Sequence, residues 1–146
     1  MRIVLFKTHE FDRLFLKKMM IDAYDDDALL HTGGDYFHDD ADEFFEKIIA
    51  DNNDVYLIKK GEKIIGLISI KENEIISLFI DSFLHNFGYG KEVMSLIDKL
   101  YEIDLIVKIP GYSKRLYHFF SKCGFKVLNE ETLNYEENII MEKKHE

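Results

Sequence analysis

The stretch that decides the fold runs from residue 78 to residue 91 and reads LFIDSFLHNFGYGK. It opens with Leu78, Phe79 and Ile80, an apolar run typical of a buried strand. It continues through a polar loop to Gly88 and Gly90. The positions that follow, 93, 96, 97, 100 and 101, are apolar at the spacing of one helical face. The stretch therefore predicts a strand, a glycine-containing turn and the start of a helix.

A turn of this kind can bind an anion. The first N–H groups of a helix have no partner within the helix, and the helix dipole makes that end positive. Glycine at this point lets a phosphate approach the backbone closely. Lys91 lies in the first turn, where a cation is unfavourable unless an anion is bound, and His85 can add a further donor. The alternative from these residues alone is a glycine turn that binds nothing.

The pattern outside this stretch predicts the remaining elements. Residues 3–7 predict a strand, and residues 10–24 and 40–49 predict helices, the second capped by Asp40. Residues 55–59, 64–70 and 74–80 predict three strands joined by tight turns. Residues 105–109 form the continuous apolar run of a buried parallel strand. Ser113 can cap a helix that ends at Gly124, and residues 125–128 and 138–141 predict a closing pair of strands.

This order of elements predicts an α/β protein. One strand–helix–strand unit requires a parallel crossover, whereas the three consecutive strands form an antiparallel meander. We therefore expect a mixed, mostly antiparallel central sheet of six to seven strands, with four helices on its two faces. We expect one domain over residues 1–146, because this length suits a single core.

Composition narrows the class of partner. The net charge is -9, from 19 Lys and Arg against 28 Asp and Glu, which disfavours nucleic acid and anionic membranes. An acidic surface attracts cationic ligands such as amines, although it can also serve solubility alone. Cys123 is the single cysteine, and no apolar run approaches the roughly 18 residues of a membrane span. We therefore expect a cytoplasmic protein with no membrane or nucleic-acid partner.

Two landmarks in this order point to a known family. Residues His85 to Gly90 fill a pattern of Gln or Arg, two residues, Gly, one residue, then Gly or Ala, directly after a fourth strand. His85 stands at the Gln or Arg position, and both glycines are in place. Residues Phe119 to Phe125 follow the pattern of a helix that ends in an aromatic residue, Tyr, two or three residues, and Gly-Phe, with Phe120 at the Tyr position. With both landmarks, the chain resembles the GNAT superfamily of acyl-CoA-dependent N-acyltransferases over nearly its full length.

The resemblance implies an N-acetyltransferase that takes acetyl-CoA as acyl donor and an amine as acceptor in a ternary complex. Backbone groups of Leu78, Phe79 and Ile80 would pair with the pantetheine arm, while the fourth and fifth strands splay apart. Ser113, where the family often has Asn, and Phe120 would lie near the cofactor. The turn would cradle the pyrophosphate through His85, Asn86, Phe87, Gly88, Tyr89, Gly90 and Lys91.

Acyl transfer to an amine needs a base, because a lysine-like amine has a pKa of about 10.4 and must lose a proton before it attacks. Glu74 lies four residues before Leu78, the distance at which the histone-acetyltransferase branch of the superfamily carries its base. Its alternative role is that of an ordinary polar residue at a hairpin edge. The family usually supplies a Tyr as the acid where this chain has Phe120. Tyr117, one turn earlier, is the candidate substitute, with packing or surface exposure as the alternative.

The acceptor side and two other functions stay open. Asp25, Asp26, Asp27, Asp35, Asp39, Asp40 and Asp42 would favour a polyamine, an aminoglycoside or a basic peptide, or would only solvate a loop. His31 and His38 lack the spacing of metal ligands, so no metal is expected. Phe120 also suits a catalytically silent module of the same fold that binds acyl-CoA. A structural or interaction protein is the third reading. Many relatives dimerise, which makes a homodimer an expectation too.

Overall fold

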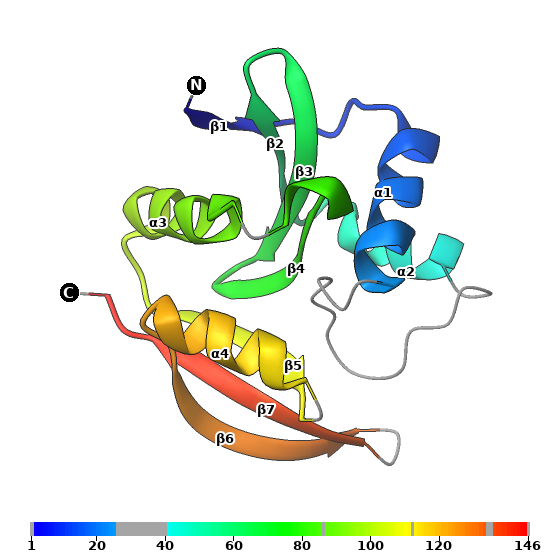
Figure 1. Cartoon of the computed structure of the whole chain (residues 1–146). Helices are drawn as coiled ribbons and strands as arrows, with labels where there is room; N and C mark the ends of the chain where they lie inside the picture. Colours follow the sequence, from blue (N-terminus) through cyan, green and yellow to red (C-terminus); the bar gives the residue numbers. More distant parts are fainter. Residues whose placement is uncertain (1, 26–40, 86, 112, 134–135, 146) are drawn as a thin grey trace.

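The computed structural model describes residues 2–25, 41–85, 87–111, 113–133 and 136–145. The elements follow the order that the sequence predicts (Figure 1), with one short 3-10 helix, η2, added. They are β1 (Ile3–Lys7), α1 (Arg13–Asp25), α2 (Ala41–Ile48), β2 (Asp54–Lys60), β3 (Lys63–Lys71), β4 (Glu74–Ile80), η2 (Ser82–Leu84), α3 (Tyr89–Tyr101), β5 (Leu105–Pro110), α4 (Lys114–Lys122), β6 (Lys126–Leu133) and β7 (Glu136–Lys143).

The seven strands form one sheet in the order β1-β2-β3-β4-β5-β7-β6. Its β4–β5 pair is parallel, and the other neighbouring pairs are antiparallel. The predicted fold class, a mixed and mostly antiparallel sheet flanked by four helices, is confirmed.

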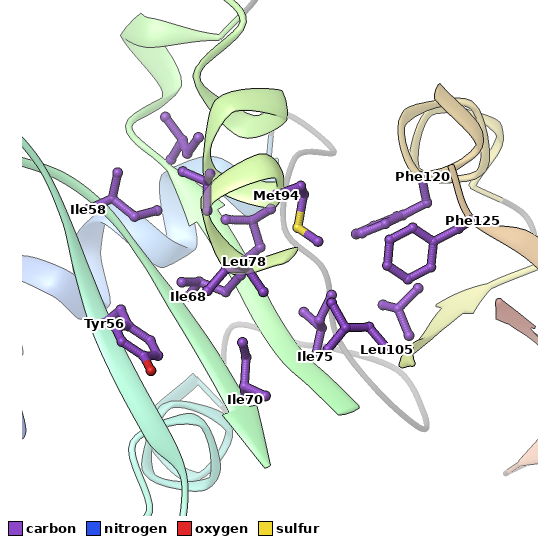
Figure 2. Packing of buried hydrophobic residues seen from close by; sticks show 14 of the residues in the cluster. Tyr56, Ile58, Ile68, Ile70, Ile75, Leu78, Met94, Leu105, Phe120 and Phe125 are labelled. Carbon is purple, nitrogen blue, oxygen red and sulfur yellow. The ribbon is translucent and has the colours of Figure 1, made fainter. Parts of the chain in front are cut away.

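The sheet separates two apolar cores, which define its two faces. The α3/α4 face buries Val93 and Met94 of α3 and Phe120 of α4 against the strands. Figure 2 shows part of this cluster gathered between strands and helices. The α1/α2 face buries Leu16 of α1 and Phe45 of α2 against the other side. Burial of two amphipathic helices on each face excludes water from both sides of the sheet.

Several element boundaries differ from prediction for local reasons. Helix α1 begins at Arg13, because the Asp12 carboxylate accepts a hydrogen bond from the Phe15 N–H at 3.0 Å and so caps the helix. The predicted cap Asp40 lies outside the described residues. Strands β6 and β7 are longer than the apolar runs at 125–128 and 138–141. The added part of β6 is polar, as an edge strand can be, and carries no apolar alternation.

A hydrogen-bonded cluster joins β1, β2 and α3. The Tyr101 hydroxyl donates to the Asp54 carboxylate at 2.7 Å and lies 3.1 Å from the Tyr56 hydroxyl. Lys7 Nζ lies 3.1 Å from the other Asp54 oxygen. The hydrogen bond from Tyr101 lowers the pKa of Asp54, and Lys7 adds to this effect. Burial, followed by the hydrogen bonds, raises the pKa of Tyr101.

This cluster predicts an acid-dependent contribution to stability. A carboxylate whose pKa is lower in the folded chain stabilises the fold above the unfolded value of about 3.9, and that contribution is lost as the pH falls through the folded value. We expect Asp54→Asn to lower the free energy of unfolding at pH 6, with a difference from wild type that shrinks below about pH 4. Urea unfolding at both pH values measures this. A difference that grows on acidification would contradict it.

Candidate functional site

The two parallel strands at the middle of the sheet separate soon after they meet. Strand β4 pairs with β5 at Glu74↔Ile106 and Ile75↔Val107, and the Ile106 N–H donates to the Asn73 carbonyl at 2.9 Å. Beyond these pairs the two strands, both fully described, have no Cα partners in each other. The rest of β4 therefore has an unpaired edge facing β5 (Figure 1).

The main-chain groups of successive residues in β4 point alternately to β3 and to the open edge. The Asp81 N–H donates to the Ile65 carbonyl of β3 at 2.7 Å. Because antiparallel strands alternate between bonded and non-bonded pairs, the main chain of Phe79 also faces β3, whereas that of Leu78 and Ile80 faces the open edge. The Phe79 side chain packs in the core of the α1/α2 face. The three residues predicted to pair with the pantetheine arm therefore do not share one edge: Leu78 and Ile80 face the split, and Phe79 faces β3.

A cavity of about 380 Å³ opens beside this edge, between the end of β4, the start of α3 and one side of α4. Seven of the predicted cofactor-binding residues line it: Leu78, Ile80, His85, Gly88, Tyr89, Gly90 and Lys91. Six further residues complete the wall: Leu84, Arg115, Leu116, Phe119, Lys122 and Cys123.

The start of α3 is open toward this cavity. Gly88 is the N-cap, with a φ of 82° and no side-chain hydrogen bond to the helix. A Cβ at Gly88 would meet no atom within 4 Å. Gly90 has a different role, because a Cβ there would lie 3.0 Å from the Phe119 ring of α4. One glycine thus gives the turn its left-handed conformation, and the other lets α4 approach α3.

The charged residues that line the cavity are positive, whereas the whole chain has a negative net charge. Lys91, Arg115 and Lys122 line the cavity, and none of the described lining residues is an Asp or Glu. The first N–H groups of α3 add a partial positive charge. His85 Nε2 donates to the Ile80 carbonyl at 2.8 Å, which fixes the ring at the cavity wall. A chain of net charge -9 therefore contains a cavity suited to an anion.

The cavity also holds the one cysteine of the chain. Cys123 follows α4 and lines the wall. Burial raises the pKa of its thiol, and the nearby Lys143 and Lys91 oppose this effect only in part. The thiol therefore stays protonated at neutral pH, which argues against a role as nucleophile.

Three predicted residues of the α4 region lie away from the cavity wall. Phe120 is 0% exposed in the α3/α4 core, with ring centroids 4.9 Å from Phe119 and 5.1 Å from Phe125. The Ser113 hydroxyl accepts a hydrogen bond from the Leu116 N–H at 3.3 Å and so caps α4, as predicted. Tyr117 is 37% exposed and packs edge-on against His118. The described part of the chain therefore places no tyrosine of α4 in the cavity.

An irregularity in β4 sets the position of Glu74. Ile76 has no partner in the β3–β4 register and is therefore an extra residue in β4. Ile75 and Leu78, on either side of it, both pack on the α3/α4 face. Because successive side chains alternate on either side of this bulge, Glu74 and Ser77 both project to the α1/α2 face. Glu74 is half-buried there and does not line the cavity.

Two buried polar groups on the same face have no hydrogen-bond partner among the described residues. They are Ser77 Oγ on β4 and Asn138 Nδ2 on β7. Asn138 projects to the α1/α2 face because its neighbours Ile139 and Met141 in β7 alternate with it, and both contact the α3/α4 core. Buried polar atoms normally have partners. Glu74 and these two groups thus form polar positions on either side of the split.

Sequence reasoning missed the part of the wall that α4 supplies. Arg115, Phe119 and Lys122 recur at i, i+4 and i+7, a helical spacing that the sequence displays but that mixes charged and aromatic residues. Asn86 and six of the seven loop aspartates lie outside the described residues or among the undescribed side chains. Asp42 of α2 is the exception, and it pairs with Lys17 of α1.

The described part of the chain lacks two features. No group of three or more His, Cys, Asp and Glu side chains is arranged to hold a metal ion. Among the described residues, no helix has both the length and the apolar character needed to cross a membrane.

Solved structures share this fold. An acetyltransferase from Bacillus subtilis in complex with CoA matches with 16% identity and a TM-score of 0.67, covering 98% of this chain and 97% of that one. AAC(6')-Ib in complex with ribostamycin and coenzyme A matches with 13% identity and a TM-score of 0.76, covering 99% and 94%. An acetyltransferase from Thermus thermophilus matches with 13% identity and a TM-score of 0.74, covering 99% and 97%. No curated protein matches the chain.

The architecture is thus that of the acetyltransferase fold, with a split sheet and an open helix start beside the split. The sequence profile of the acetyltransferase (GNAT) family matches residues 17–125. This chain belongs to that family, as its two sequence landmarks predict.

Proposed function

We propose that the chain transfers an acetyl group from acetyl-CoA to a primary amine by direct attack in a ternary complex. The observation that carries this proposal is the cation-lined cavity at the uncapped start of α3, beside the open edge of β4. A diphosphate suits the free N–H groups of such a helix start. The pantetheine arm suits this strand edge, because it carries amide groups that can pair with the N–H and carbonyl of Leu78 and with the N–H of Ile80. The Ile80 carbonyl is already bonded to His85.

Acetyl-CoA supplies an activated thioester, and the residues of the chain supply binding and proton transfer. We assign Glu74 as the base that takes a proton from the amine, directly or through water. The amine nitrogen then bonds to the carbonyl carbon and gives up its second proton, and the carbon–sulfur bond breaks. CoA leaves as a thiolate that takes up this second proton from solvent. A thiol has a pKa of about 8.5, so this anion departs without a strong acid.

The acceptor site in this proposal is the α1/α2 face of the split. Glu74 is half-buried on that face and supplies a carboxylate, whereas Ser77 Oγ and Asn138 Nδ2 on the same face are buried. The net charge of -9 favours a cationic acceptor such as a polyamine, an aminoglycoside or a basic peptide. The aminoglycoside in one structural relative belongs to that protein, and here it serves only to choose a first compound to test.

Phe120 supports a second candidate, a catalytically silent module that binds acyl-CoA. Its ring fills the core without a hydroxyl, and Tyr117 lies on the exposed side of α4. Loss of a general acid costs about 10²–10⁴ in rate where the leaving group needs one. Such a module would bind acetyl-CoA and release no CoA in the presence of amines.

Two measurements on the full chain test these candidates. Calorimetry with acetyl-CoA should give binding heat, and its absence would overturn both candidates. Release of free thiol should follow when a polyamine, an aminoglycoside or a lysine peptide is added with acetyl-CoA. Binding without thiol release across the whole panel would reject the transferase and favour the silent module.

A further inference from the structure

Phe87 presents an exposed aromatic ring beside the cavity. Its side chain is 66% exposed. Its ring stacks on that of Tyr89, with centroids 6.0 Å apart and planes 23° apart. Phe87 directly precedes Gly88, the N-cap of α3, and Tyr89 and Gly88 line the cavity whereas Phe87 does not. Its ring therefore lies outside the wall, next to the position assigned to the diphosphate.

The stack is anchored to the sheet. Lys60, the last residue of β2, donates a hydrogen bond from Nζ to the Tyr89 hydroxyl, and Nζ lies 5.0 Å from the Tyr89 ring centroid. Tyr89 thus has a fixed orientation, and Phe87 rests on it. A single exposed apolar side chain needs no explanation by itself. The Phe87 ring, however, stacks on a second aromatic ring and lies next to an anion site, and that combination suits a nucleotide.

We propose that Phe87 stacks on the adenine base of the coenzyme and so makes the chain select the nucleotide end of CoA. The inference rests on the proposed function. A cavity of about 380 Å³ is near the small end of pockets that hold drug-sized ligands. In the proposed complex the pantetheine arm and the diphosphate fill this cavity, so the nucleoside lies at the rim of the cavity. Aromatic side chains bind bases in this way on many proteins, because every base has a π-face.

Calorimetry with two probes on the full chain tests the inference. One probe is CoA, and the other is 4′-phosphopantetheine, which keeps one phosphate but lacks the second phosphate and the 3′-phosphoadenosine. We expect Phe87→Ala to weaken CoA binding about 5- to 150-fold, the range that base–aromatic stacking gives on alanine substitution. Binding of 4′-phosphopantetheine should be unchanged. Phe83→Ala is the matched control, because Phe83 is 89% exposed on η2 and does not line the cavity.

A second variant gives a direct reading. The chain contains no tryptophan, so Phe87→Trp introduces a single tryptophan at the proposed contact, and its fluorescence can be excited apart from that of the tyrosines. We expect CoA binding to be retained and the fluorescence to be quenched by CoA but not by 4′-phosphopantetheine. Unchanged CoA affinity in Phe87→Ala, or an equal loss for both probes, would overturn the inference and leave the proposed function intact. A wild-type chain that binds neither probe would overturn both.

Discussion

Glu74→Gln is expected to lower the turnover number about 10²–10⁴-fold, the usual contribution of a general base, while coenzyme affinity stays unchanged. Glutamine keeps the size and hydrogen-bonding reach of the side chain but cannot accept the proton of the amine. Glu74 is the first residue of β4 and projects to the α1/α2 face, whereas the coenzyme cavity lies beside α3 and α4. The substitution should therefore separate catalysis from binding.

The matched control is Glu72→Gln. Glu72 lies in the turn between β3 and β4, is exposed and carries the same charge two residues earlier in the chain. Glu72→Gln should keep wild-type turnover. That result would show that the loss of one negative charge near the strand does not explain the lower turnover of Glu74→Gln. Thiol release with the best acceptor of the panel measures turnover, and calorimetry with CoA measures affinity. Wild-type turnover in Glu74→Gln would remove Glu74 from the mechanism and leave the cavity assignment standing.

The order of elements was predictable because it depends on local signals. Apolar periods of two and 3.6 residues, the continuous apolar run at 105–109 and turn or cap residues at the boundaries together identified every strand and α-helix. The register irregularity at Ile76 was not predictable, since it arises from the way β4 fits against β3. That irregularity places Glu74 and Ser77 on one face, and sequence alternation alone would have put them on opposite faces.

The site was partly predictable for a similar reason. The turn around Gly88 carries its own chemistry, so its residues could be chosen from the sequence. The contribution of α4 depends on how closely this helix approaches α3, and that approach is set by the contact between Gly90 and Phe119. Phe120 has the spacing of the family motif, but its position in the core is a property of packing with Phe119 and Phe125.

Gly66→Ala is expected to lower the free energy of unfolding by about 3 kcal/mol, the upper part of the usual range for overpacking. Gly66 lies on β3, opposite Ile80 of β4. A Cβ there would lie 2.3 Å from the Phe79 carbonyl oxygen and 3.1 Å from the Ile80 Cα. Both atoms belong to the backbone, so no rotamer change can relieve the contact. Urea unfolding and thermal melting measure the loss, with an expected fall in Tm of about 6–12 °C.

The same change should also weaken coenzyme binding, because the relief available to the structure is a movement of β4 away from β3. That movement narrows the split in which the pantetheine arm is placed.

Gly88→Ala is the comparison for the free energy of unfolding: its Cβ meets no atom within 4 Å, and its φ of 82° costs only about 1–2 kcal/mol for a residue other than glycine. If Gly66→Ala is no less stable than Gly88→Ala, the close approach of β3 to β4 is not a constraint. The position of the open edge would then need a different physical cause.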